Sequence, residues 1–185
     1  MKKTAILIIF LFSFQLFSQE VIKSNPSFIN EFNGWNYGVN LDNHDFHVQD
    51  AAFSIVKESN DNDGASCKVK VKISTTSENL NDVYLQNKSI ELKKNKIYRI
   101  CFYVKSDFLK DKVQVSIGSG ELSNARYLTT REQKFIGDGS WKKISFTFKV
   151  TKDKKGLDYD NLFFMIGFNH RFGEFYVDDF SMNRI

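Results

Sequence analysis

Apart from its first twenty residues, the sequence lacks any apolar run that approaches the length of a membrane span. The one apolar run, from Ala5 to Phe17, follows two lysines and leads into polar residues, which is the pattern of a secretory signal peptide. We therefore expect residues 1–19 to be a signal peptide, with an uncleaved anchor as the alternative, and residues 20–185 to be secreted or periplasmic. No cysteine lies near the cleavage region, so a lipid anchor of the bacterial lipoprotein type is not expected.

A strong excess of one charge is also lacking. The full chain has 26 basic and 22 acidic residues, and removing the two lysines of the signal peptide leaves 24 and 22, a net charge of +2. This balance does not produce the long-range positive field of a dedicated nucleic-acid binder. Internal repeats and low-complexity linkers are missing as well, so we expect residues 20–185 to form one domain. We also expect this domain to be monomeric.

Common catalytic motifs are absent. The chain has no GxSxG, HExxH or phosphate-cradling glycine motif. His44 and His47 lie three residues apart, so on a strand they would point to opposite faces, and His170 has no evident partner. Glycoside hydrolysis needs only two suitably spaced carboxylates, which 22 acidic residues always permit, but no feature favours it. We therefore do not expect an enzyme.

The mature sequence is instead rich in alternation of apolar and polar residues with a period of two, which predicts β-strands. Asn, Asp, Gly and Ser separate the segments, and 19 phenylalanines are available to fill a core. Eight or nine strands are expected, which is the number that a two-sheet β-sandwich or jelly roll of the galactose-binding-like type requires. Their expected ranges are 52–57, 66–73, 83–92, 98–105, 113–117, 133–136, 144–150, 162–168 and 175–182.

The two cysteines are expected to remain unpaired, with a disulfide between Cys67 and Cys101 as the alternative. The alternation points Cys67 toward the core and Cys101 away from it, and their spacing does not suit a zinc site.

A regular stripe of basic residues has two interpretations. It is either a solvated outer face or, with the cationic Arg99 and Lys105, a binding surface for an anionic polysaccharide. The stripe consists of Lys68, Lys70 and Lys72.

Four motifs in order resemble the carbohydrate-binding modules of families 4, 9 and 22, which are jelly rolls commonly attached to glycoside hydrolases. The motifs are Asn25-Pro26-Ser27-Phe28 followed by Gly34-Trp35; Val83 to Asn87 leading to Tyr98, Phe102 and Lys105; Trp141 before Phe146 and Phe148; and Phe175 to Phe180. The resemblance spans nearly all of the mature chain. It implies a noncatalytic domain that binds a polysaccharide or oligosaccharide.

The resemblance also implies a structural calcium ion, held between the opening segment and the aspartates of the closing strand. Asp178 and Asp179 are the candidate ligands, and a solvated strand end is the alternative for both. The family usually has an acidic residue just after the opening phenylalanine, where this chain has Ile29, which cannot bind a cation.

Carbohydrate in this family lies on the outer face of one sheet, where aromatic rings pack against sugar rings and polar side chains bind hydroxyl groups. We expect that outward residues of two adjacent strands form the groove. Tyr127, in a loop expected over residues 126–131, is a candidate for its edge. Trp35 and Trp141 are expected to be structural. The candidate binding residues are Tyr84, Gln86, Asn87, Arg99, Tyr103, Lys105, Tyr127 and Tyr37.

Two other functions stay open at this point. A jelly-roll subunit for adhesion or assembly would bind another protein through a large apolar outer patch. A small polysaccharide-degrading enzyme, such as a lyase, would release products from a glycan, which a binder would not.

Overall fold

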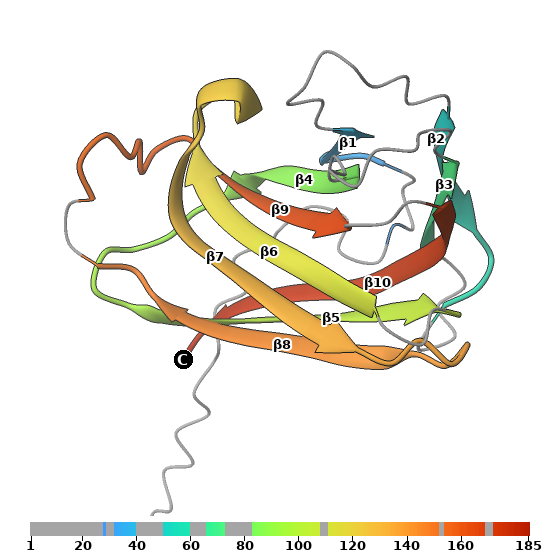
Figure 1. The fold of residues 1–185 in the computed structure, drawn as a ribbon. Coiled ribbons are helices and arrows are strands. Elements are labelled where there is room, and N and C mark those ends of the chain that lie inside the picture. Colours follow the sequence, from blue (N-terminus) through green and yellow to red (C-terminus); the bar gives the residue numbers. More distant parts are fainter. Residues whose placement is uncertain are drawn as a thin grey trace, which may run out of the picture.

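The computed structural model describes residues 28, 32–39, 50–59, 66–72, 83–107, 111–151, 154–168 and 172–185 (Figure 1). The predicted signal peptide, Ile29 and the three histidines lie outside these residues. The described residues form ten strands and one short 3-10 helix, Leu122–Asn124. The strands are β1 (Trp35–Val39), β2 (Asp50–Val56), β3 (Ser66–Lys72), β4 (Val83–Ile90), β5 (Ile97–Ser106), β6 (Asp111–Ser119), β7 (Arg126–Phe135), β8 (Lys142–Lys149), β9 (Leu162–Phe168) and β10 (Phe172–Arg184).

The strands form two five-stranded sheets. We call β1-β4-β9-β6-β7 the front sheet and β2-β3-β10-β5-β8 the back sheet, in the order of their hydrogen-bonded neighbours. All paired strands in both sheets are antiparallel. The two sheets lie face to face, and β6 and β7 curve across the front of the molecule (Figure 1). The predicted all-β sandwich is confirmed.

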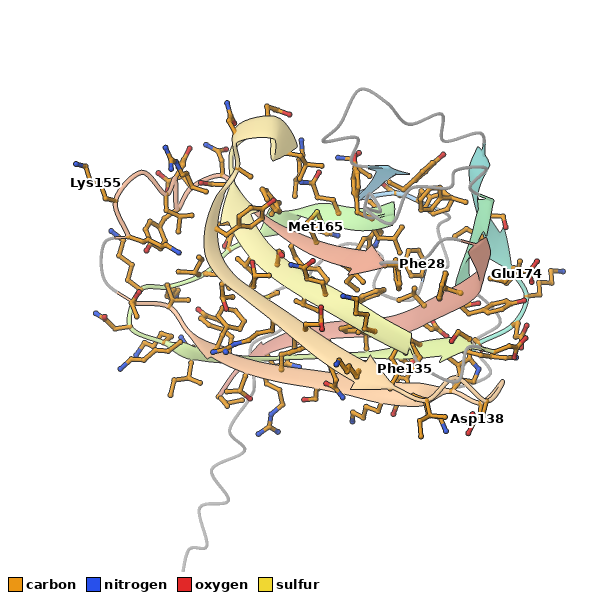
Figure 2. The ribbon with its side chains drawn as sticks, viewed as in Figure 1. Phe28, Phe135, Asp138, Lys155, Met165 and Glu174 are labelled. Carbon is orange, nitrogen blue, oxygen red and sulfur yellow. The ribbon has the colours of Figure 1, made fainter. Side chains whose placement is uncertain are left out.

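The core lies between the two sheets, and alternation explains which residues fill it. In β5, every second residue from Tyr98 to Val104 is buried, as predicted. All of β9 is buried, and it is the central strand of the front sheet, between β4 and β6. Phe28 lies between the sheets and contacts the rings of Trp35 and Phe180 at centroid distances of 5.2 and 5.7 Å (Figure 2). Trp35 is therefore part of the core, as expected.

Nine of the ten strands match the nine predicted segments, and β1 is the additional one. Its sequence, WNYGV, has a glycine and an asparagine that weaken the alternating pattern. The loop predicted over residues 126–131 is wrong, because these residues belong to β7. β7 is an edge strand with exposed polar residues on both faces, so its sequence gives little alternation to recognise.

A β-bulge interrupts β10 at its paired aspartates. The register with β5 shifts between Asp178 and Ser181, and Asp179 has a positive φ of 52°. The extra residue lets both Val177 and Phe180 point into the core, although they are three positions apart. The bulge therefore sets where the aspartates lie.

Candidate functional site

Three rows of side chains cross the outer face of the front sheet, which we call the front face. Residues that are direct partners in antiparallel strands point to the same side, so the register defines each row. The first row is Gly38, Tyr84, Gly167, Gln114 and Glu132; the middle row is Asn36, Gln86, Met165, Ser116 and Thr130; and the third is Lys88, Phe163, Gly118 and Tyr127.

The middle row forms a floor whose three central residues are buried, although they point away from the core. Gln86 is 3% exposed, Ser116 is 2% exposed and Met165, labelled in Figure 2, is 7% exposed. The Ser116 and Thr130 hydroxyls lie 3.3 Å apart, within hydrogen-bond distance. Two amides, two hydroxyl groups and a thioether give this floor hydrogen-bonding capacity and an apolar centre without any net charge.

Tyr84 is seated against a glycine of the neighbouring strand. A Cβ atom placed on Gly38 would lie 2.8 Å from the Tyr84 hydroxyl oxygen, so the phenol ring occupies the space that only glycine leaves open. Burial raises the pKa of the Tyr84 phenol, and its hydroxyl group therefore stays protonated at neutral pH and can donate a hydrogen bond.

Tyr127 has a corresponding seat on the other side of the floor. A Cβ atom on Gly118 would lie 2.9 Å from Phe163 and 3.1 Å from Tyr127, so both rings pack over this glycine. The two rings meet edge to face, with centroids 6.1 Å apart. The front face therefore carries two fixed tyrosine rings at diagonal corners of a neutral floor.

A pocket of about 280 Å³ opens at the end of the third row. Its lining combines a cation, a carboxylate and an amide over the apolar Leu162 and Phe163. The polar lining residues are Lys88, Glu121 and Asn161, with Gly120 beside them. This is the mixture of convergent polar groups and apolar floor that small-molecule sites commonly have.

Neighbouring loop residues hold the pocket rim in place. The Asn161 side-chain amide donates a 2.7 Å hydrogen bond to Asp158, and the Asp158 backbone N–H donates to the Ser119 hydroxyl at 2.9 Å. The bond from Asn161 helps to hold the pKa of the Asp158 carboxyl below its usual range. The Asn161 side chain is thereby held at the pocket rim by a group that stays ionised at neutral pH.

The predicted groove on two adjacent strands is wrong. Tyr84 and Gln86 lie on β4 of the front sheet, whereas Arg99, Tyr103 and Lys105 lie on β5 of the back sheet. The strands are consecutive in sequence, but the chain crosses from one sheet to the other between them, as is common in sandwich folds. The two groups therefore occupy opposite outer faces of the molecule.

Asn87 and Tyr37 are placed on the inner side of the front sheet. Asn87 is completely buried and follows the outward Gln86 by one residue. Tyr37 pairs with the core residue Leu85 and packs its ring against Phe53, 4.5 Å away, at the edge of the sandwich. Tyr37 is 48% exposed, but neither residue belongs to the front face.

The buried position of Asp178 corrects the alternative of a solvated strand end for this residue. Asp178 is 0% exposed, and its carboxylate accepts a 2.9 Å hydrogen bond from the backbone N–H of Asp179. Ser66 precedes Cys67, the β3 partner of Val177, so Ser66 and Asp178 are neighbours at this end of the ladder. The Ser66 hydroxyl is buried and has no hydrogen-bond partner in the described part of the chain.

Several front-face residues were not predicted from the sequence, although the signal was present. The sequence predicts a strand over residues 113–117, in which Val113, Val115 and Ile117 are buried, and the same alternation places the residues between them on the opposite face. The pocket could not have been found in this way, because it joins residues of β4 and β9 with the segments that follow β6 and precede β9. The unpredicted residues are Asn36, Lys88, Gln114, Ser116, Gly118, Thr130, Glu121, Asn161, Phe163 and Met165.

Comparison with known proteins identifies the family. The sequence model described as "Carbohydrate binding domain" matches residues 24–159, which is most of the chain. The chain belongs to this carbohydrate-binding domain family. Its function is the binding of carbohydrate. A search of curated proteins finds no match.

Solved structures share the fold of this carbohydrate-binding domain at low sequence identity. A family 61 carbohydrate-binding module in complex with β-1,4-galactotriose is 16% identical, with a TM-score of 0.59 over 91% of this chain and 100% of that one. The CBM22-1 xylan-binding domain of Paenibacillus barcinonensis Xyn10C is 12% identical, with a TM-score of 0.53 over 82% and 86%.

Larger proteins contain a similar domain. An arabinose-bound α-L-arabinofuranosidase of family GH51 is 13% identical, with a TM-score of 0.64 over 89% of this chain and 26% of that one. The carbohydrate-binding domain thus spans about a quarter of the length of that enzyme.

Proposed function

We propose that the front face binds a segment of a neutral polysaccharide. The observation that carries the proposal is the neutral floor of Gln86, Met165 and Ser116 between two fixed tyrosine rings. Sugar rings have apolar faces that pack against aromatic rings, and their hydroxyl groups need donors and acceptors that are already held in place. Both requirements are met by residues of this face.

The proposed ligand path runs from Tyr84 across the floor to Tyr127 and the pocket. The two tyrosines are separated by three strand spacings, about 14 Å across the sheet, so the path is long enough for an oligosaccharide. The pocket would receive one sugar unit, with Lys88, Glu121 and Asn161 binding its hydroxyl groups.

The domain is proposed to bind without cleaving its ligand and to act outside the cytoplasm. The match to a family of carbohydrate-binding domains supports binding without cleavage. No helix among the described residues is long and apolar enough to span a membrane. The lysine-led apolar run at residues 1–19 supports export through a signal peptide.

Affinity electrophoresis against a panel of neutral polysaccharides tests the proposal. We expect Tyr84→Ala and Tyr127→Ala each to weaken retention about fivefold, because each variant loses one aromatic contact. Tyr103→Ala is the matched control, since it removes a tyrosine from the opposite face and should leave retention unchanged. Equal retention of all three variants and the wild type would show that the front face is not the binding site.

A calcium ion at Asp178 is a second proposal. The buried carboxylate of Asp178 and the unpartnered Ser66 hydroxyl fit a hard cation, and they supply two oxygen atoms of the six to eight that calcium requires. No group of three or more His, Cys, Asp or Glu side chains gathers within the described ranges, so backbone carbonyl groups or water would complete the coordination.

Thermal unfolding with and without a chelator tests this site. We expect a calcium chelator to lower the melting temperature of the wild type, because an ion that binds only the folded state stabilises it. Asp178→Asn should remove this dependence on calcium. A wild-type melting temperature that is the same with chelator and with calcium would refute the site.

A further inference from the structure

Three aromatic rings lie on the outer face of the back sheet, which we call the back face. Tyr176 of β10 is the partner of Lys105, and Tyr103 of β5 is the partner of Lys143. Trp141 immediately precedes β8, and its ring contacts Tyr176 edge to face with centroids 6.3 Å apart. All three rings are half-buried, so each keeps part of its surface open to solvent.

Two lysine ammonium groups lie over these rings. Lys105 Nζ is 5.2 Å from the centre of Tyr176, and Lys143 Nζ is 5.8 Å from the centre of Tyr103. Such contacts hold a cation and an aromatic surface side by side. Glu58 pairs with Lys105, whereas Lys143 has no ion pair with any residue that the structure describes.

Further cations continue this pattern along β5 and β8. Arg99 points to the same side as Tyr103, four residues away and so about 13 Å along the strand. Arg99 is exposed and also makes no ion pair within the described residues. Hydroxyl groups of Ser145 and Thr147 lie between these cations, and the exposed Lys149 ends the row. The back face thus has positive groups at intervals, with polar groups between them.

The backbone register adds basic positions to the same face. Lys68 is the β3 partner of Tyr176, and Lys70 is the partner of Glu174. Among the outward residues of β5, β8 and β10 whose side chains the structure describes, four are basic (Arg99, Lys105, Lys143 and Lys149) and two are acidic (Glu174 and the buried Asp178, the partner of Tyr103). Positive charge is concentrated on the face opposite the neutral floor.

We propose that the back face is a second binding surface, and that its ligand is an acidic polysaccharide. An acidic sugar presents an apolar ring face and an anionic group together, which matches the rings of Tyr103 and Tyr176 beside the lysine ammonium groups. The repeated anionic groups of such a polymer match the spaced cations Lys143 and Arg99. This surface is independent of the front face and does not rest on the function proposed for it.

The probes are polygalacturonate and its highly methyl-esterified form, which share a backbone but differ in charge. We expect the wild type to be retained by polygalacturonate in affinity electrophoresis, less so as salt is added, and only weakly by the ester. The double variant Arg99→Gln/Lys143→Gln should weaken retention about fivefold, because exposed ion pairs each contribute modestly. Lys96→Gln/Lys155→Gln is the matched control, since it removes two exposed cations that lie outside both faces.

Each outcome decides the proposal. Selective loss in the Arg99/Lys143 variant, with unchanged binding of neutral polysaccharide, supports it. Equal retention in the two double variants would overturn it, as would equal retention by the acid and its ester. Double-stranded DNA serves as a second polyanion, and retention of the wild type by DNA as strong as by polygalacturonate would overturn the assignment to acidic polysaccharide. Unchanged thermal unfolding of both double variants confirms that they are folded.

Discussion

The two outer faces of this sandwich differ in the charged side chains that they carry. The front face has a neutral floor, and its Lys112 and Glu132 pair with each other at 3.0 Å toward one end. The back face has Arg99 and Lys143 without ion pairs among the described residues, and its lysines lie over aromatic rings. One domain thus offers a surface suited to sugar hydroxyl groups and another suited to anionic groups.

The comparison also shows two ways of fixing an aromatic ring on a sheet. On the front face, glycines make room for the rings of Tyr84 and Tyr127, which lie close to the backbone. On the back face, lysine ammonium groups lie over the rings of Tyr103 and Tyr176 instead. The first arrangement leaves a ring beside a neutral floor, and the second places a lysine ammonium group over the ring.

Replacing Gly118, the glycine against which Tyr127 packs, should have the largest effect on stability. In Gly118→Ala the new Cβ atom would lie 2.8 Å from the backbone oxygen of Arg126, which cannot move without distorting β7. We expect a loss of about 2 kcal/mol in the free energy of unfolding, typical of overpacking. Denaturant titration measures it, and an unchanged unfolding midpoint would show that the seat is not tightly packed.

Adding a methyl group at Gly38, next to Tyr84, should reduce stability less than the same change at Gly118. Its main effect should be on ligand affinity. The Cβ atom in Gly38→Ala would meet the far end of the Tyr84 side chain, which can swing away. Stability should change by less than about 0.5 kcal/mol, while affinity for the neutral polysaccharide should fall about threefold as the ring leaves its position. A variant that binds as tightly as the wild type would remove Tyr84 from the site.

The smallest expected effect is that of pH on the affinity of the front face for the neutral polysaccharide. Because burial raises the pKa of the Tyr84 phenol above its usual value near 10, the hydroxyl group stays protonated throughout the neutral range. Affinity for the neutral polysaccharide should therefore be constant between about pH 6 and pH 9. A decline with a midpoint inside this interval, measured by isothermal titration calorimetry, would contradict this role for Tyr84.

Local alternation made most of the fold predictable from the sequence. Segments such as Leu162–Phe168 and Ile97–Ser106 have apolar patterns that specify a central strand and a half-buried strand. The alternation also gave the correct outward direction for Tyr84, Gln86 and Tyr103. It missed β1 and predicted only the last residues of β7; these are the two edge strands of the front sheet and have weak patterns.

The site was harder to predict because it depends on which strands become neighbours. Alternation gives the side to which a residue points within its own strand, but not the sheet to which that strand belongs. Tyr84 and Tyr103 therefore seemed to share a groove, whereas pairing of β4 with β1 and β9 separates them. Tyr127 joins the front face only through the long-range pairing of β6 with β7 and β9.

Chemical-shift mapping of the backbone amides during titration with a neutral oligosaccharide that the protein binds tests the central claim most directly. The account predicts that the largest changes occur in β4, β9 and β6 and around Tyr127, with little change in β5 and β8. Changes centred on β5 and β8 would instead place the neutral ligand on the back face and contradict the account.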